Sequence, residues 1–276
     1  MTAFCDLHTH TFYSDGSLSP AELVKRAEEA GISAIALTDH NSVAGLPEFL
    51  AVASSVERVA GVEFTTEHNG VELHIIGLFV KEQDYPAIRE RLEILRKNKD
   101  LATRHLVENL QKAGYDLDLD ALLGKTQGII NRAHIATALT EKGYTASVKE
   151  AFSKLLSPKC GYYVSPKRPD ACDTVAFIKS IGAVAILCHP FLNLTEEELL
   201  DFLPLAKAAG LDAMETEYST YDEATTRKAK EIARQFGLLE SGGSDFHGEN
   251  KPDISVGKGR GNLAIPIEFL EKMRNV

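Results

Sequence analysis

Short apolar segments alternate with amphipathic segments along most of this 276-residue chain, and this alternation limits the possible folds more than any other feature. Runs such as AIALT and AVAILC are apolar throughout, which is typical of parallel strands buried on both faces. So many β–α repeats favour a closed barrel over an open sheet. Strands are expected at 4–9, 34–38, 58–66, 71–80, 183–188, 213–217 and 238–241, and helices at 20–30, 43–55, 171–181, 196–209 and 223–236.

The middle of the chain interrupts this pattern. The strands at 58–66 and 71–80 are expected to be joined by a turn at His68-Asn69-Gly70, and helices follow at 84–114, 133–142 and 147–156. A crossover between parallel strands needs only about a dozen residues. We therefore expect a barrel domain formed by 1–80 and 169–276, and a helical insertion at 81–168 that could cover a site.

Histidines and acids follow the predicted strands. The carboxyl ends of barrel strands share one rim, so residues distant in sequence would meet there. Imidazole and carboxylate groups suit first-row divalent ions. One such histidine alone is usually structural, but the repeated pattern predicts a metal cluster. Its nine expected ligands are His8, His10, Asp15, His40, Glu63, His74, His189, Asp245 and His247. His68, in a polar turn, and His105, on a charged helix, are expected to be exposed to solvent.

Composition and charge exclude several other classes. The net charge of −10 argues against a protein that coats nucleic acid, so no stable nucleic-acid complex is expected. No apolar run approaches the roughly 20 residues of a membrane span. The N-terminal residues do not have the pattern of a signal peptide. The four cysteines are scattered, and Cys5 and Cys188 lie in apolar strands, so we expect a cytoplasmic protein without disulfides.

The motifs CDLHTHTFYSDGSLSP, ALTDHN, GVEFT, HIIGL, ILCHP and GGSDFH together resemble the PHP (polymerase and histidinol phosphatase) family, in its branch of small stand-alone phosphoesterases. The resemblance implies an α/β fold: a distorted, TIM-like (β/α)7 barrel with a trinuclear metal site. In the family pattern, one ion is held by His8, His10, Glu63 and Asp245, a second by Glu63, His74 and His189, and a third by Asp15, His40 and His247.

The resemblance also bears on the substrate. Histidinol-phosphatase-like members often have a histidine where this chain has Asp15, so the chain is more similar to the nucleotide-phosphoesterase branch. In that branch, residues of the insertion line a phosphate pocket. The matching positions here are Arg132 and His134 in NRAH, and Lys159 and Tyr162 in KCGY, where Cys160 replaces an expected proline.

The expected reaction is hydrolysis of a phosphate ester by a hydroxide shared by two metal ions. Manganese is the expected metal, with zinc or iron as alternatives. His189, His247 and Asp245 are the expected catalytic residues, and Asp39 either orients a ligand or caps a loop. The expected substrate is a small phosphorylated nucleotide, foremost a nucleoside 3′,5′-bisphosphate. Histidinol phosphate, a cyclic nucleotide and a short oligoribonucleotide are the alternatives.

Three other classes of protein fit less well. An amidohydrolase also begins with H-x-H on a barrel strand, but it typically ends on a lone aspartate, whereas this chain ends on D-x-H. A non-catalytic PHP module attached to a polymerase often loses ligands, and all nine are present here. A metal-storage protein would have no use for Arg132 or for a long insertion.

Overall fold

The computed structural model describes residues 3–125 and 131–276. The first two residues of the predicted barrel segment and residues 126–130 of the predicted insertion lie outside this range. The chain forms two compact units. Unit 1 consists of Met1–Arg89 and Pro169–Val276, and unit 2 of Glu90–Arg168. The first boundary lies within helix α3 (Tyr85–Lys112).

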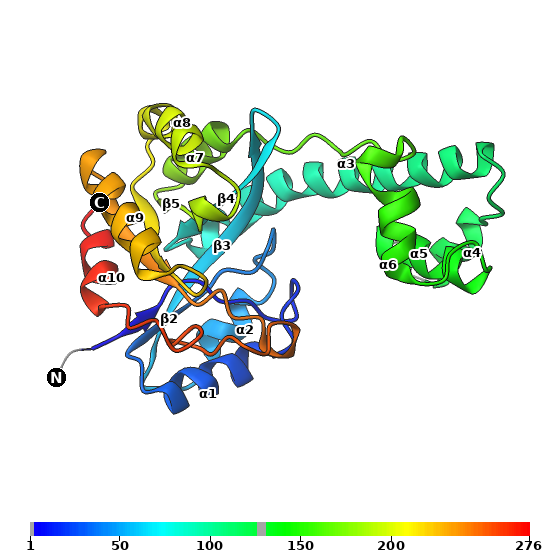
Figure 1. Cartoon of the computed structure of the whole chain (residues 1–276). Helices are drawn as coiled ribbons and strands as arrows, with labels where there is room; N and C mark the ends of the chain where they lie inside the picture. Colours follow the sequence, from blue (N-terminus) through cyan, green and yellow to red (C-terminus); the bar gives the residue numbers. More distant parts are fainter. Residues whose placement is uncertain (1–2, 126–130) are drawn as a thin grey trace. The chain divides into compact units, whose positions relative to one another are not determined.

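Unit 1 is built around a seven-stranded sheet with the strands in sequential order (Figure 1). Its strands are β1 (Cys5–Asp6), β2 (Ala34–Leu37), β3 (Glu57–His68), β4 (Val71–Leu78), β5 (Val184–Leu187), β6 (Ala213–Tyr218) and β7 (Leu239–Gly243). Backbone hydrogen bonds from Leu7 N to Gly242 O and from Asp245 N to His8 O connect the ends of the sheet. The sheet is therefore a nearly closed barrel, which confirms the predicted fold.

Strand β4 departs from the expected parallel sheet. It pairs antiparallel with both β3 and β5, whereas the other pairs are parallel. The reason is the tight turn at Asn69 and Gly70, whose φ angles are 50° and 79°. Since only two residues separate β3 from β4, the chain must reverse direction there. The barrel is distorted at this hairpin.

The helices of unit 1 flank the barrel. They are α1 (Pro20–Ala30), α2 (Leu46–Ala51), α7 (Ala171–Ser180), α8 (Glu196–Ala209), α9 (Glu223–Gln235) and α10 (Ile267–Met273), with short 3₁₀ turns at Glu82–Asp84, Pro190–Leu192 and Gly248–Asn250. Ser19 and Glu22 cap α1 reciprocally, as their spacing predicted. The predicted helix at 43–55 is shorter in the structure, because Pro47 is tolerated only in a first helical turn.

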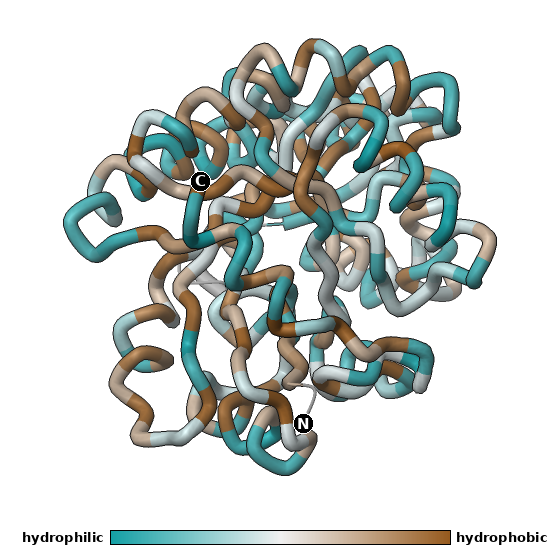
Figure 2. The backbone as a smooth tube through the Cα atoms, turned by 90° about the vertical axis from the view of Figure 1, so that its left-hand side faces the viewer, coloured by the Kyte–Doolittle hydropathy of each residue, from teal (hydrophilic) through white to brown (hydrophobic). Residues whose placement is uncertain are grey.

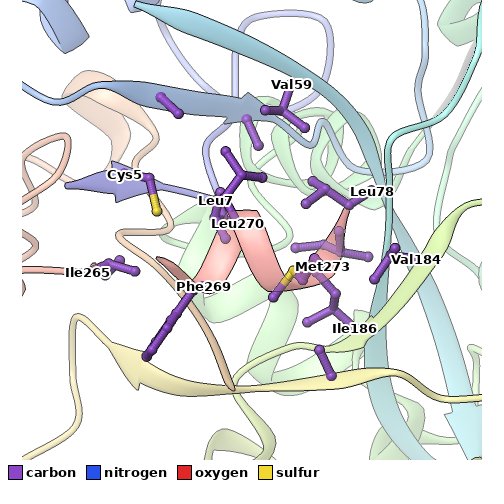
Figure 3. Packing of buried hydrophobic residues seen from close by; sticks show 14 of the residues in the cluster. Cys5, Leu7, Val59, Leu78, Val184, Ile186, Ile265, Phe269, Leu270 and Met273 are labelled. Atoms are coloured by element: carbon purple, nitrogen blue, oxygen red, sulfur yellow. The ribbon is translucent and has the colours of Figure 1, made fainter. Parts of the chain in front are cut away.

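Apolar side chains fill the barrel below the carboxyl ends of its strands. Alternate residues such as Cys5 and Leu7, or Val184 and Ile186, belong to one buried cluster (Figure 3). Helix α10, which the sequence did not predict, adds Phe269, Leu270 and Met273 to this cluster. Burying each large apolar side chain contributes about 1.5–3 kcal/mol. The barrel therefore has a stable apolar base beneath its polar rim.

Unit 2 is helical and has a core of its own. After α3 it contains α4 (Leu119–Lys125), which was not predicted, α5 (Arg132–Glu141) and α6 (Val148–Ala151), followed by a π-helical turn at Phe152–Leu156 and a 3₁₀ turn at Pro158–Cys160. The core includes Leu106, Leu110, Ile135 and Leu139. Along the helical turns that face the viewer in Figure 2, hydrophilic and hydrophobic residues alternate. Among the described helices, none has the length and apolar character needed to cross a membrane.

Candidate metal centre

The structure brings all nine predicted ligands together in unit 1. His8 and His10 follow β1, His40 follows β2, Glu63 lies in β3 and His74 in β4, His189 follows β5, and Asp245 and His247 follow β7. Most of these side chains are buried, whereas that of Asp15 is 56% exposed. The parallel strands bring their carboxyl ends to one rim, whereas the antiparallel β4 reaches this rim with His74 in its first half, opposite Thr65 of β3.

Glu63 lies at the centre of the group. Its Oε2 lies 3.1 Å from His8 Nε2, 3.3 Å from His10 Nε2 and 3.0 Å from His40 Nδ1. Burial disfavours its charge, but the three nearby histidines His8, His40 and His74 hold the pKa of Glu63 well below its usual value. The carboxylate is therefore ionised and available to cations on more than one side.

The second oxygen of Glu63 faces two further histidines. Its Oε1 lies 2.8 Å from His74 Nδ1 and 3.3 Å from His189 Nε2. Burial alone would lower the pKa of His74, but the carboxylates of Glu63 and Glu72 raise it to about 10. His189 has a φ of 26°, a backbone conformation that non-glycine residues rarely adopt. Such strain persists where the surrounding structure fixes a functional side chain.

Asp245 divides its oxygens between two sets of partners. Its Oδ1 lies 3.3 Å from His10 Nε2 and 3.4 Å from His247 Nδ1. Its Oδ2 accepts hydrogen bonds of 2.6 Å from both the Tyr218 hydroxyl and Lys251 Nζ. Asp245 also has a positive φ, of 56°. Oδ1 thus faces the histidines, while Oδ2 is held by the hydrogen bonds from Tyr218 and Lys251.

Asp15 contacts the group from an exposed loop. Its Oδ1 lies 3.2 Å from His247 Nε2 and 3.8 Å from His10 Nδ1, and its Oδ2 lies 3.8 Å from His40 Nε2. Burial lowers the pKa of His10 to about 3, so this ring is neutral near pH 7 and has a lone pair to donate. Three imidazoles therefore surround one ionised carboxylate at this side of the rim.

Asp39 holds the loop that carries Asp15. The buried Asp39 carboxylate accepts hydrogen bonds from Thr11 N at 2.7 Å, Thr11 Oγ1 at 2.6 Å and Ser14 Oγ at 2.7 Å. These bonds fix the chain between His10 and Asp15. Of the two roles considered for Asp39, the contacts support that of a loop-capping residue.

The donor atoms fit divalent ions. Buried nitrogens of His8, His10, His40 and His74, together with Glu63 Oε2, have no hydrogen-bond partner of acceptable geometry among the described residues. A buried polar atom without a partner costs free energy that a bound cation would recover. Within the described chain, three sets of these atoms each lie within 4.8 Å of one another: His10, Asp15, His40 and His247; His8, His10 and Glu63; His40, Glu63 and His74.

Comparison with known proteins identifies the family. The family model described as PHP domain matches residues 6–164, which is more than half of the chain. The chain belongs to the PHP family. A 5′-3′ exoribonuclease of Haemophilus influenzae is 32% identical to this PHP protein over 90% of the chain and 91% of the relative. A 3′,5′-nucleoside bisphosphate phosphatase of Chromobacterium violaceum is 30% identical over 91% of the chain and 90% of the relative.

A solved structure supports the same assignment. The crystal structure of a candidate metal-dependent phosphoesterase from Bifidobacterium adolescentis superposes with a TM-score of 0.74 and 26% identity, covering 98% of this chain and 95% of that one. Together with the buried histidine and carboxylate cluster, these relatives establish the PHP protein as a metal-dependent phosphoesterase, as its motifs predicted.

Sequence reasoning missed Glu215. Glu215 is a buried residue of β6. Its Oε1 lies 2.9 Å from His8 Nδ1, and its Oε2 accepts a 2.7 Å hydrogen bond from the backbone N–H of His189. With Cys188 and His8 it forms a fourth set of closely spaced atoms in the described chain. An acid near the end of an otherwise apolar predicted strand was the signal that could have revealed it. Lys251, which binds Asp245, carried no comparable signal.

His68 is not exposed to solvent as predicted. Its side chain is 18% exposed, its ring packs against Phe202 with 4.9 Å between centroids, and its Nδ1 lies 3.6 Å from Asp170 Oδ2. The prediction was wrong because a hairpin turn can pack against a neighbouring helix, here α8. His105 is exposed, as expected.

The predicted substrate residues lie in unit 2. The Arg132 guanidinium lies 4.4 Å from the centre of the Tyr163 ring and donates a 3.3 Å hydrogen bond to Leu156 O. His134 Nδ1 accepts a hydrogen bond from Asn131 N and so helps to cap α5. The packing of Arg132 on an aromatic ring fixes the direction of a side chain that has five donors.

The other two predicted substrate residues, Lys159 and Tyr162, differ in burial. Lys159 is exposed on a 3₁₀ turn. Tyr162 is half-buried against the core of unit 2, and its carbonyl oxygen accepts a 2.9 Å hydrogen bond from Asn109 Nδ2. These contacts explain how Tyr162 is held within unit 2, and its role toward a substrate stays a prediction.

Proposed function

We propose that this PHP phosphoesterase hydrolyses nucleotide phosphoesters, with a nucleoside 3′,5′-bisphosphate as its preferred substrate and manganese as its metal. The C. violaceum relative is named for this activity and matches nearly the whole chain. Asp15, in place of the histidine of histidinol-phosphatase-like members, supports the same branch. Histidinol phosphate is therefore the less favoured substrate.

The uneven distribution of charge is the observation that carries this proposal. Unit 2 contains 14 lysines and arginines but nine aspartates and glutamates. The rest of the chain contains 16 lysines and arginines and 31 aspartates and glutamates. The net charge of −10 therefore conceals a basic insertion. Local positive potential attracts anionic ligands whatever the global charge. The positive excess of unit 2 supports a role for the insertion in binding an anionic substrate.

The nine clustered residues would hold three divalent ions in the groups that the family pattern implies. Divalent ions at such a site act as Lewis acids on a phosphoryl group and make water more acidic. Glu63 would serve two groups, because its two oxygens face different histidines. Asp245 would keep Oδ1 directed at the ions, because Tyr218 and Lys251 hold Oδ2.

Departure of the alcohol requires a proton. His189 and His247 are the chain's own candidates for this transfer, since both imidazoles lie at the rim beside ionised carboxylates. His247 Nδ1 lies 2.8 Å from the carbonyl oxygen of Asp245, which favours a proton on that nitrogen. To give a proton to the alcohol from Nε2, the ring of His247 would have to be doubly protonated.

Arg132 is proposed to bind the second phosphate of a bisphosphate. Metal ions would already bind the phosphate that is cleaved, so a separate set of donors is useful only for a substrate with a second anionic group. A guanidinium matches phosphate with two parallel hydrogen bonds. In this role the insertion at 81–168, with His134, Lys159 and Tyr162, would act as a substrate-binding lid.

A second candidate activity is 5′-3′ exonucleolysis of short RNA. The H. influenzae relative carries that name, and the positive excess of unit 2 suits a ligand with several phosphates. Both activities cleave a nucleotide phosphoester. They differ in how many further phosphates the enzyme must hold.

Substrate preference and Arg132→Ala test this proposal together. The parent is expected to have the highest kcat/KM for a 3′,5′-bisphosphate among that compound, the matching monophosphate, histidinol phosphate and a short oligoribonucleotide. Arg132→Ala is expected to lower kcat/KM for the bisphosphate by about 10- to 100-fold, since charge-assisted hydrogen bonds contribute about 1.5–3 kcal/mol. The loss for the monophosphate should be much smaller.

The matched control is Arg104→Ala, which removes an arginine of unit 2 that bonds to Asp100. Its kcat/KM for each of the four substrates should be close to that of the parent. A parent that prefers histidinol phosphate, or an Arg132→Ala variant equally active on every substrate, would contradict the bisphosphate assignment. A strong preference for the oligoribonucleotide would favour the exonuclease instead.

A further inference from the structure

Strand β6 supplies none of the nine predicted ligands, although the ligands come from or directly follow each of the other six strands or the loop after β1. It nevertheless contributes two buried polar side chains, Glu215 and Tyr218, beside the cluster. These two residues are three positions apart in the sequence. Neighbouring residues of a regular strand alternate between its faces, so positions three apart would normally point in opposite directions.

An irregularity in β6 removes this conflict. Glu215 pairs with Ser241, but Glu217 already pairs with Gly242 and Tyr218 with Gly243. Thr216 is therefore an extra residue, as in a β-bulge, which redirects the side chains that follow it. Glu217 consequently bonds to Lys230 of α9, at 2.7 Å, whereas Tyr218 joins Glu215 on the side of the cluster.

Glu215 contacts two ligand residues at once. One oxygen bonds to His8 Nδ1 at 2.9 Å and the other to the backbone N–H of His189 at 2.7 Å. The first bond directs His8 Nε2 towards Glu63, and the second holds His189 in its strained backbone conformation. Because both oxygens are already engaged and the side chain is buried, the contacts are those of a positioning residue, not of a ligand.

Tyr218 acts on a third ligand residue. Its hydroxyl donates a 2.6 Å hydrogen bond to Asp245 Oδ2 and leaves Oδ1 facing the histidines. The bond limits rotation of a carboxylate whose own backbone is strained.

We propose that β6 is the positioning strand of the metal centre: through the bulge at Thr216 it directs Glu215 to His8 and His189, and Tyr218 to Asp245, and thereby orients ligands from three other strands. This inference rests on the metal cluster proposed above. Carboxylates that orient metal-binding histidines typically change metal affinity by about 10- to 100-fold when they are replaced. The strand thus sets how tightly the ions are held without touching them.

The test compares manganese retention in Glu215→Gln, Tyr218→Phe and the control Glu217→Gln with that of the parent. Each manganese-loaded protein is dialysed against graded chelator, its metal content is measured by elemental analysis, and its thermal unfolding is followed in excess chelator. Glutamine has one carbonyl oxygen and cannot accept both hydrogen bonds. Glu215→Gln should lose half its metal at a chelator concentration about 10- to 100-fold lower than the parent, and Tyr218→Phe should shift in the same direction.

The control and the saturated state separate the possible explanations. Glu217→Gln alters the same strand on its other face and should retain metal like the parent. At saturating manganese, Glu215→Gln should recover the parental metal count, because every ligand is still present.

Parental retention in both variants would overturn the inference, as would a permanent loss of one ion in Glu215→Gln, which would make Glu215 a ligand. A parent that binds no manganese would overturn the cluster itself. Tyr218→Phe removes only a hydroxyl and keeps the test valid if Glu215→Gln fails to fold.

Discussion

Replacing Glu63 with glutamine is expected to lower kcat/KM by about a thousandfold or more. The Glu63 carboxylate is buried and faces five histidines, three through Oε2 and two through Oε1. An amide keeps the shape but loses the charge and one acceptor oxygen, so two of the three proposed ions would be held more weakly. Metal stabilisation of a phosphoryl transition state amounts to several kcal/mol, and about 1.4 kcal/mol corresponds to tenfold in rate.

Steady-state kinetics at saturating manganese measures this effect, with Glu57→Gln as the control. Glu57 lies at the other end of the same strand and pairs with Arg274. Its replacement should leave kcat/KM within about twofold of the parent, as is usual for exposed surface positions. If Glu63→Gln retained near-parental turnover and its full metal content, Glu63 would not be the shared ligand.

His10→Ala is expected to cause the second large loss, again of about a thousandfold in kcat/KM. His10, like His40, belongs to two of the sets of closely spaced atoms, one with Asp15 and one with Glu63. Burial lowers its pKa to about 3, so the ring is neutral near pH 7 and offers a lone pair and not a charge. Its removal should therefore reduce the number of bound ions as well as the rate.

Kinetics and elemental analysis of the same preparation would measure both effects. His105→Ala is the suitable control, because His105 is an exposed histidine on α3 in unit 2. It should match the parent in rate and in metal content. A His10→Ala protein with parental turnover and an intact metal complement would remove His10 from the ligand set.

The barrel and the positions of its polar rim were predictable because they depend on local patterns. Apolar strands followed directly by histidines or acids, as in AVAILC before His189, place ligands at one rim whatever the details of packing. The apolar runs around Cys5 and Cys188 likewise indicated that both thiols are buried, as the structure shows. Helix caps such as Ser19 with Glu22 were readable for the same reason, since they involve residues close in sequence.

Features that depend on contacts between distant segments were not predictable. The bulge at Thr216 exists only relative to β7, so nothing in β6 alone reveals that Tyr218 faces Asp245. The strained backbone of His189 is imposed by its surroundings and leaves no mark in composition. Helix α10 is a short segment whose apolar residues become informative only when they meet the base of the barrel.

The most direct test of the metal centre is the metal content of the protein produced with excess manganese. Nine clustered histidine and carboxylate residues suit about three divalent ions, at about three protein ligands each. Elemental analysis should therefore find about three ions per chain, and their removal by chelator should abolish phosphoester hydrolysis, with recovery on adding manganese. One ion per chain or none, or activity that survives complete removal of metal, would contradict the trinuclear phosphoesterase centre.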